Sequence, residues 1–335
     1  MIQPLIAVTM GDPVGIGPEI TVKALSDPAV HALCRPLVLG DSSVLHSAMA
    51  LTGQHLHIRE VSCASEAHFQ PGTLNLIPLS SLPSSPAWGR PDRETGQAMV
   101  HYILRAIDMA LAGEVAAIVT GPINKYAMNL SGYAYSGHTE LLAERTGTRD
   151  YVMMLAGDRI RVSLVTIHTA LRNVPDLITP EKIRTTLRVT HRALVERFAI
   201  PAPSIAVAGL NPHAGESGMF GDEEERILQP ALEQARSEGI DAQGPFPPDT
   251  LFYHVDQGRF DAVVAMYHDQ GLIPFKMRHF EDGVNTTLGL PIIRTSVDHG
   301  TAYDLAGRGR ADHRSLLAAI HMAAIHARNT MAVPL

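Results

Sequence analysis

Three histidines that each follow an apolar, β-branched segment are the residues in this sequence best suited to chemistry. They are His168 after SLVTI, His213 in LNPHAGE and His268 in AMYHDQG. Loops at the carboxyl ends of strands in an open α/β sheet line its ligand crevice, so these imidazoles can converge although they are distant in sequence. Three neutral imidazoles also leave a position open for substrate or water, as a catalytic metal requires. A single histidine more often caps a turn, but the repeated pattern favours a divalent-metal site.

Two aspartates lie beside this set. Asp269 directly follows His268, and Asp249 lies in GPFPPDT. Either carboxylate could orient a ligand imidazole or accept a hydroxyl proton as a general base. Aspartate also forms turns and caps helices, and for Asp249, which follows two prolines, that structural role is about as plausible. The sequence leaves open which aspartate is the base.

Several polar side chains are candidates for holding an anion. The segment SGHTE, Ser136–Glu140, stands at an expected helix start, where free N–H groups and the helix dipole favour phosphate. Further along, IPFK and IIRTS each end an apolar run on a basic residue, and DGVNTT lies between them. A surface charge could explain either basic residue, but their nearness to His268 favours ligand binding. The substrate-binding candidates are His138, Thr139, Lys276, Asn285 and Arg294, and Lys276 is also a catalytic candidate.

Two loops are rich in glycine. GDPVGIGPE follows the first expected strand, but it lacks GxGxxG and the acidic residue of a Rossmann fingerprint. A tight turn with Pro18 at the first helical position explains it. The second loop, SVDHGTAYDLAGRG, has enough small residues for its backbone to lie against a flat adenosine. The cofactor-binding candidates in that loop are His299, Gly300, Thr301, Ala302, Asp304 and Gly307.

The elements that must position these residues alternate between short β-branched runs and helical patterns, which predicts βαβ units with mostly parallel strands. A chain of 335 residues is long for one core, so we expect two domains. We place residues 1–127 and 280–335 in one, and 128–279 in the other. Expected strands are 5–9, 36–40, 73–77, 115–120, 151–155, 162–167, 204–208 and 262–266; expected helices are 19–25, one from 42, 95–112, 180–197, 223–237 and 314–328.

Composition excludes several classes of protein. A net charge of -7 and the lack of a basic run argue against nucleic-acid binding. No apolar stretch is long enough to cross a membrane, and the first residues lack the features of a signal peptide. Only Cys34 and Cys63 are present, so a disulfide framework is excluded. We therefore expect a cytoplasmic protein that binds neither membranes nor nucleic acids.

Together the motifs resemble the 4-hydroxythreonine-4-phosphate dehydrogenase family of vitamin B6 synthesis, including its paralogues that act on four-carbon phosphorylated acids. The resemblance spans residues 9 to 309, and its last block is also similar to the adenosine loop of isocitrate and isopropylmalate dehydrogenases. It implies two α/β/α domains with mostly parallel sheets and an active site in the cleft between them. The matching blocks are TMGDPVGIGPEI, TGPINK, GHTE, LNPHAGE, MYHDQG, GVNTTLGLP and RTSVDHGTAYDLAGRG.

The resemblance also implies roles for residues. It places His168, His213 and His268 on the divalent-metal ligands, with Zn, Mg, Co or Mn as the metal, and the five substrate-binding candidates on positions that hold the substrate. NAD or NADP is implied along Gly300–Gly309. The family forms homodimers with a shared active site, so one ligand histidine can come from the partner chain.

The function implied is metal-dependent oxidation and decarboxylation of 4-phosphohydroxy-L-threonine to 3-amino-2-oxopropyl phosphate and CO2. The alternative is dehydrogenation of 4-phospho-D-threonate or D-erythronate 4-phosphate in sugar-acid catabolism. The phosphate candidates disfavour a branch that oxidises unphosphorylated dihydrodiols. From other classes, a phosphate acyltransferase or a non-catalytic nucleotide- or metal-binding protein shares parts of the pattern, but neither explains both the histidines and the adenosine loop.

Overall fold

A computed structural model describes residues 3–135 and 137–332, which form two compact units. The first unit contains residues 3–148 and 290–332, and the second is Arg149–Gly289. The first unit consists of two separate segments of the chain, and its boundaries lie further along the chain than the predicted residues 127 and 279. The reason is packing: helix α5 (Lys125–Leu130) lies against α4 (Arg93–Leu111), and strand β11 (Val284–Leu288) pairs with β6 (Val152–Ala156).

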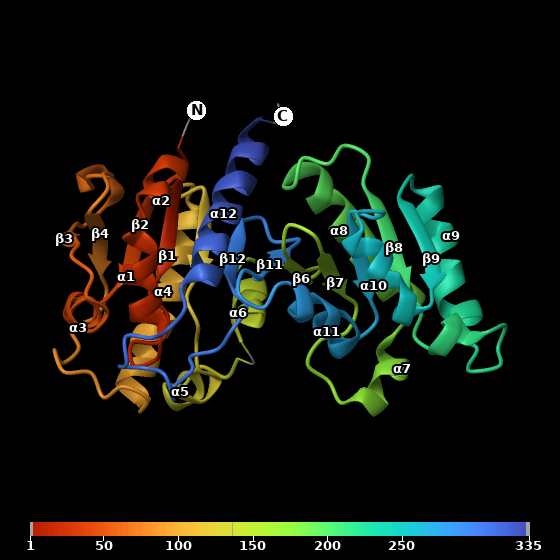
Figure 1. Cartoon of the computed structure of the whole chain (residues 1–335), viewed down its shortest axis with the longest axis horizontal. Helices are drawn as coiled ribbons and strands as arrows, with labels where there is room; N and C mark the ends of the chain where they lie inside the picture. The colour runs from red at the N-terminus through yellow and green to blue at the C-terminus, as the bar shows by residue number, and fades with distance from the viewer. Residues whose placement is uncertain (1–2, 136, 333–335) are drawn as a thin grey trace. The chain divides into compact units, whose positions relative to one another are not determined.

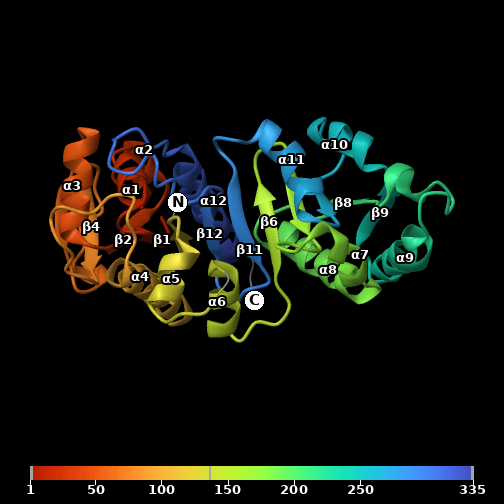
Figure 2. The ribbon, with the colours of Figure 1, turned by 90° about the horizontal axis from the view of Figure 1, so that it is seen from below.

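The first unit contains a parallel sheet in the order β3-β4-β2-β1-β5-β12. Helix α4 covers one face, and α1 and α12 lie on the other (Figures 1 and 2). The strands are β1 Leu5–Thr9, β2 Arg35–Gly40, β3 His57–Glu60, β4 Thr73–Pro78, β5 Ala117–Thr120 and β12 Arg294–Val297. The remaining helices are α1 Gly17–Leu25, α2 Pro28–Leu33, α3 Ser42–Thr52, α6 His138–Arg145 and α12 Arg314–Ala332.

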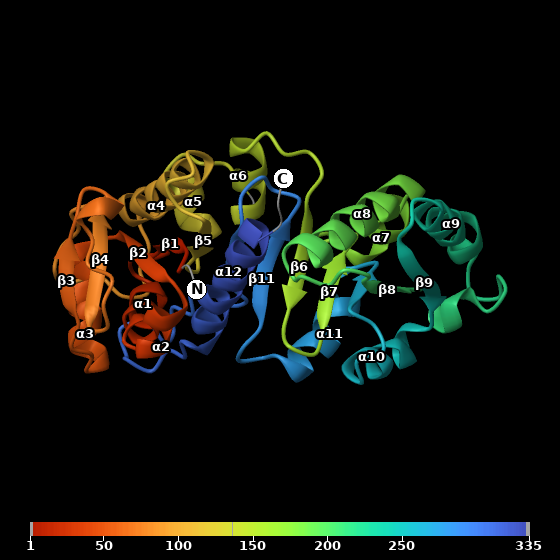
Figure 3. The same ribbon diagram turned by 90° about the horizontal axis from the view of Figure 1, so that it is seen from above.

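The second unit contains strands in the order β11-β6-β7-β10-β8-β9. Strand β6 is antiparallel to both of its neighbours here, and β7, β10, β8 and β9 run parallel. Helices α8 and α9 cover one face, and α10 and α11 cover the other (Figure 3). The strands not yet given are β7 Arg161–Leu164, β8 Ser204–Ala208, β9 Asp241–Phe246 and β10 Ala262–Ala265. The helices are α7 Val174–Leu177, α8 Pro180–Glu196, α9 Gln229–Ser237, α10 Pro248–Asp256 and α11 His268–Arg278.

The central strands form because their side chains are apolar on both faces, which is typical of parallel sheets covered by helices. All five residues of β1 and all four of β5 and β10 are buried. Capping fixes the helix starts: Asp92 accepts from the Thr95 backbone N–H at the start of α4, and Thr179 accepts from that of Lys182 at α8. The predicted α/β class with mostly parallel strands is confirmed.

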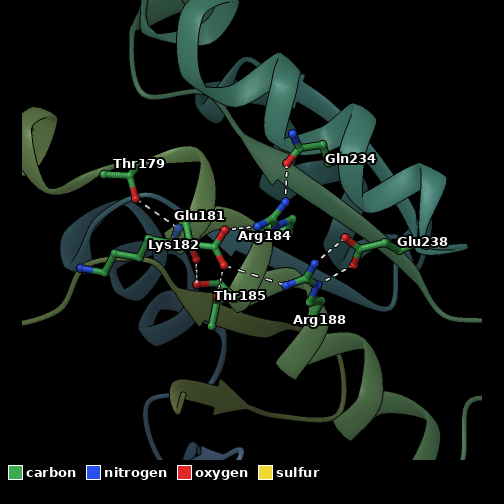
Figure 4. Close-up of polar contacts among 9 residues, drawn as sticks. Thr179, Glu181, Lys182, Arg184, Thr185, Arg188, Gln234 and Glu238 are labelled. Atoms are coloured by element: carbon green, nitrogen blue, oxygen red, sulfur yellow. Dashed lines mark hydrogen bonds and ion pairs between the residues drawn. The ribbon is translucent and has the colours of Figure 1, made fainter. Parts of the chain in front are cut away.

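A network of charged side chains joins the two helices on one face of the second unit (Figure 4). Arg184 of α8 donates to Gln234 Oε1 at 2.6 Å and also pairs with Glu181. Arg188 donates through two nitrogens to the Glu238 carboxylate, at 2.5 and 2.6 Å. Such solvent-exposed pairs contribute little to stability, because water and salt screen them. We therefore assign this cluster to helix packing.

Within the described part of the chain, no helix combines the length and apolarity needed to cross a membrane.

Candidate active site

The three predicted metal-binding histidines all follow neighbouring parallel strands of the second unit. His168 lies just after β7, His268 after β10 and His213 after β8, and β10 pairs with both of the other strands. The carboxyl ends of neighbouring parallel strands lie at one edge of a sheet, so the topology brings the three loops to the same edge. A strand order this specific could not be read from the sequence.

Two of these imidazoles are in contact. The rings of His168 and His268 lie with their centroids 5.7 Å apart. His268 Nδ1 lies 2.7 Å from an oxygen of Asp269. A carboxylate on Nδ1 fixes the ring orientation and leaves Nε2 to bind a metal, as carboxylates hydrogen-bonded to ligand histidines do in many metal sites. This contact is compatible with the orienting role predicted for Asp269.

His213 lies on a strained loop at the third strand end. The backbone φ values of His213, Ala214, Glu216 and Ser217 are all between 43° and 53°, in the left-handed region that non-glycine residues seldom adopt. Such conformations persist only where surrounding contacts hold them, and they gather at functional sites. Here the buried carboxylate of Glu224 forms hydrogen bonds at the start of the loop.

Glu224 anchors the start of the His213 loop. Its Oε1 accepts from the backbone N–H groups of Leu210 and Asn211 at 2.8 and 2.7 Å, and its Oε2 accepts from Asn211 Nδ2 at 2.9 Å. Gln270 adds a second tie, since it donates to Gly209 O at 2.7 Å and accepts from the backbone N–H of Met266. The loops that carry His213 and His268 are thus joined through buried side chains.

Within the described part of one chain, the three histidines do not form a single cluster of ligand atoms. Residues 3–135 and 137–332 hold one group of three potential ligands whose atoms all lie within 4.8 Å of one another, and it does not include these histidines. The side chain of His213 is 59% exposed, and its ring lies against Phe220, with centroids 5.9 Å apart. Asp249 is exposed in the first turn of α10, a helix that contacts the His213 loop.

Two substrate-binding candidates lie elsewhere in the second unit. Lys276 is on α11, the helix that begins with His268, and Asn285 is on β11. Both side chains are partly buried. Each residue therefore lies on a helix or strand that follows His268 in the sequence. Their binding roles stay predictions.

The other anion candidates lie in the first unit. Arg294 is only 2% exposed, and its guanidinium donates to Thr120 Oγ1 through Nε at 3.2 Å and Nη2 at 2.8 Å. Burial lowers the pKa of Arg294 to about 9, so the side chain keeps a poorly solvated positive charge at neutral pH. An anion bound there would stabilise that charge.

His138 and Thr139 begin helix α6, as the motif predicted. Ser136 of the same motif lies outside the described residues. The Nε2 atom of His138 is buried and has no hydrogen-bond partner. An unsatisfied buried polar atom is costly, so this nitrogen fits a hydrogen bond to a bound ligand.

The expected cofactor loop is held in place by the turn that follows β1. Tyr303 OH donates to Asp12 Oδ2 at 2.5 Å, and the Gly307 N–H donates to Glu19 Oε1 at 2.7 Å. Lys23 Nζ donates to Gly309 O and Ala311 O, both at 2.8 Å. These contacts fix the backbone of residues 303–311 from one side.

The opposite side of that loop has open space beside its backbone. Gly300 is exposed, and a Cβ atom there would meet nothing within 4 Å. His299 Nε2 is buried without a hydrogen-bond partner, while Nδ1 lies 3.0 Å from Gly300 O. Asp304 is exposed and Ala302 has a φ of 41°. The segment can therefore accept a flat group against its backbone, which fits a nicotinamide dinucleotide.

Comparisons with known proteins agree with this arrangement. A family model described as "Pyridoxal phosphate biosynthetic protein PdxA" matches residues 32–323. This chain belongs to the PdxA family. It is 58% identical over 322 residues to the 4-hydroxythreonine-4-phosphate dehydrogenase of Desulfosudis oleivorans, covering 96% of this chain and 95% of that one.

Two further relatives refine the comparison. The D-threonate 4-phosphate dehydrogenase of Cupriavidus necator is 48% identical over 323 residues, 96% of each chain. The crystal structure of the 4-hydroxythreonine-4-phosphate dehydrogenase of Klebsiella pneumoniae has a TM-score of 0.88 and 45% identity, covering 97% of this chain and 100% of that one. The predicted family is confirmed, and this PdxA-family chain is a dehydrogenase that uses a nicotinamide cofactor.

Sequence reasoning missed part of the machinery of this PdxA-family chain. The sequence explains the turn GDPVGIGPE as a helix start, but Asp12 and Glu19 on it are fully buried and hold the backbone of the expected cofactor loop at Tyr303 and Gly307. A Cβ on Gly15 would lie 3.0 Å from Thr301 Cβ, so the two segments pack tightly. A signal was present, because two carboxylates in an otherwise apolar turn are unusual unless they have buried partners.

The imidazole of His138 is expected to make the stability of this PdxA-family chain depend on pH. Burial, together with the positive charge of Arg294, lowers the pKa of His138 well below its usual value. In the unfolded chain the imidazole takes up a proton below about pH 6.5. The unfolded state then binds more protons than the folded state, so acid favours unfolding.

We therefore expect His138 to reduce the free energy of unfolding by up to about 1.4 kcal/mol per pH unit below pH 6.5. His138→Gln is expected to remove this part of the pH dependence, measured by urea unfolding at several pH values. His101→Gln, at an exposed position of α4, is the control. An unchanged slope in His138→Gln would show that His138 is protonated in the folded chain.

Proposed function

We propose that this enzyme oxidises and decarboxylates 4-phosphohydroxy-L-threonine, giving 3-amino-2-oxopropyl phosphate and CO2 with reduction of NAD or NADP. The observation that carries the proposal is the set of three histidines at the ends of neighbouring strands, two of them in contact. The 58% identical relative named for this activity supports the choice of substrate.

The residues fit a divalent cation. The imidazoles of His168 and His268 lie together, and Asp269 holds His268 with Nε2 available. We propose these two and His213 as the ligands, with Zn, Mg, Co or Mn as the candidate metals. Such an ion would supply Lewis acidity, which lowers the pKa of a bound hydroxyl and stabilises the negative charge that develops when CO2 leaves.

We propose Asp249 as the general base. The Asp269 carboxylate already holds His268, whereas Asp249 is exposed on a helix that contacts the His213 loop. An ionised carboxylate there can accept the proton of the substrate hydroxyl as the hydride leaves the same carbon. Lys276 is proposed as a further catalytic and substrate-binding group, and Asn285 as a neutral hydrogen-bonding group.

The substrate phosphate is proposed to bind Arg294, His138 and Thr139. The planar guanidinium can donate two parallel hydrogen bonds to phosphate oxygens, and its burial makes them stronger than in water. The N–H groups at the start of α6 favour an anion as well. Holding the distant phosphate fixes the reacting carbon and so converts binding energy into rate.

The cofactor is proposed to lie along residues 299–309. Bound there, NAD or NADP supplies the hydride acceptor. His299, Gly300, Thr301, Ala302, Asp304 and Gly307 are the proposed contacts. The hydrogen bonds to Asp12, Glu19 and Lys23 keep the loop backbone in one conformation, which lowers the entropy lost on binding.

We further propose that the enzyme is a homodimer whose metal site draws histidines from both chains. Within the described part of one chain, His168 and His268 lie together, but the ligand atoms of the three histidines do not all lie within 4.8 Å of one another, so we expect His213 from the partner. Helix α11 and the residues after it supply an apolar surface for association: Ile273, Met277 and Phe280 are 60%, 85% and 78% exposed. Large apolar side chains exposed together commonly mark a protein interface.

The experiment that tests the function is a substrate panel. The enzyme is mixed with NAD or NADP, one of Zn2+, Mg2+, Co2+ or Mn2+, and 4-phosphohydroxy-L-threonine, 4-phospho-D-threonate or D-erythronate 4-phosphate. Turnover is measured from the absorbance of the reduced cofactor. We expect the highest kcat/KM with 4-phosphohydroxy-L-threonine. Fastest turnover of 4-phospho-D-threonate would favour the second candidate, which the 48% identical D-threonate 4-phosphate dehydrogenase supports. No reduction with any substrate would overturn the proposal.

A further inference from the structure

A second group of potential metal ligands lies in the second unit and has no part in the chemistry described above. It consists of Asp158, His279 and Asp282, which each offer one ligand atom within 4.8 Å of the others. Asp158 is on the turn between β6 and β7, and the other two lie between α11 and β11. The group therefore joins segments that are more than a hundred residues apart.

The imidazole of this group is buried, and only one of its two nitrogens has a hydrogen-bond partner. His279 is 2% exposed, with Nδ1 3.1 Å from an oxygen of Asp282. Its Nε2 is buried without a hydrogen bond and lies 3.5 Å from an oxygen of Asp158. That separation is too long for a good hydrogen bond but is close to the spacing of two ligands that share one cation.

The surroundings hold the ring in this position. A Cβ atom on Gly157 would lie 2.5 Å from the His279 ring, so only glycine allows the turn to pack this closely. On the other side, the Phe275 ring lies 5.3 Å from it between centroids. The two carboxylates are 78% and 55% exposed, which leaves room for water to complete a coordination shell.

The charges nearby also permit a cation. Arg161 is a positive group that acts electrostatically on Asp158, but its guanidinium donates to Asp261 O at 3.1 Å and lies over the Phe198 ring at 5.1 Å. The group pairs two carboxylates with one imidazole, so a divalent ion bound there would have its charge balanced by the two carboxylates. Oxygen-rich sets of this kind suit Mn2+ and similar ions.

We propose that Asp158, His279 and Asp282 form a second divalent-cation site, of the type that binds Mn2+, apart from the three strand-end histidines. A cation there ties the β6–β7 turn to the connection between α11 and β11. Helix α11 carries His268 and Lys276, and strand β11 carries Asn285. The ion would therefore stabilise the two elements that bear these proposed site residues.

The test counts Mn2+ ions bound to the chelator-treated full chain, from the electron paramagnetic resonance signal of free Mn2+. Wild type is expected to bind two ions per chain, and His268→Ala one. In the His268→Ala chain, replacing both carboxylates (Asp158→Asn with Asp282→Asn) is expected to lower the affinity for the remaining Mn2+ ion by at least about tenfold. Both substituted positions are exposed, so the fold is expected to survive.

Asp176→Asn in the same His268→Ala chain is the matched control, since Asp176 is an exposed aspartate of the second unit outside the group. Equal Mn2+ binding with and without the Asp158 and Asp282 carboxylates would overturn the proposal. The proposed histidine site is scored separately: if the carboxylate substitutions remove one ion from wild type but His268→Ala removes none, the second site stands and the catalytic metal assignment fails.

Discussion

Replacing His213 with alanine is expected to lower kcat by on the order of 10³-fold or more, because a lost metal ligand removes several kcal/mol of transition-state stabilisation. The side chain is 59% exposed and lies on a loop held by Glu224, so the fold should persist. Turnover is followed by formation of reduced cofactor, and bound metal is counted per chain. One equivalent of metal is expected to be lost.

The control is His254→Ala, which removes an exposed histidine of α10 in the same unit. Its turnover and metal content should match those of wild type. Full activity of His213→Ala together with an undiminished metal content would end the assignment of His213 as a ligand.

Mixing two inactive variants extends this prediction to the dimer. If His213 and His268 meet from different chains, a dimer of one His213→Ala chain and one His268→Ala chain contains one site with both histidines intact. With free exchange, half of the dimers are mixed and have one site of two, so about a quarter of wild-type activity should return. No recovery in a mixture that sedimentation shows to have exchanged would contradict a shared site.

Replacing Arg294 with methionine is the second change with a large expected effect. A buried guanidinium that pairs with an anion typically contributes 2 to 5 kcal/mol, so we expect kcat/KM for the phosphorylated substrate to fall by on the order of 10²-fold or more. Methionine keeps much of the apolar volume around the stem. For the same substrate without its phosphate, wild type and variant should differ little.

Two controls separate binding from folding. Arg310→Ala removes an exposed arginine of the same unit and should leave kcat/KM unchanged. Because Arg294 is fully buried, thermal unfolding of the Arg294→Met chain must show a single transition near that of wild type before its kinetics are interpreted. If the folded variant processes the phosphorylated substrate as well as wild type does, Arg294 does not bind the phosphate.

Every helix and strand expected from the sequence is present, because each rests on a local signal: an apolar run bounded by turn residues, or helical spacing with a cap. Some of the elements that were missed lack such signals. Helix α11 contains Gly271 and Pro274, which disfavour a helix locally, and is stabilised by Leu272 and Phe275 packing into the core. Strands β11 and β12 are short runs in a glycine-rich segment and depend on pairing with distant partners.

The sequence by itself determined the class of fold, the family and the residues suited to chemistry, because these follow from local patterns and from motifs. Only the tertiary structure decided that β7, β10 and β8 are neighbours, and that Asp12 supports the proposed cofactor loop through Tyr303. Strand order and buried hydrogen bonds between segments far apart in the chain depend on how the whole chain packs, and no local pattern encodes them.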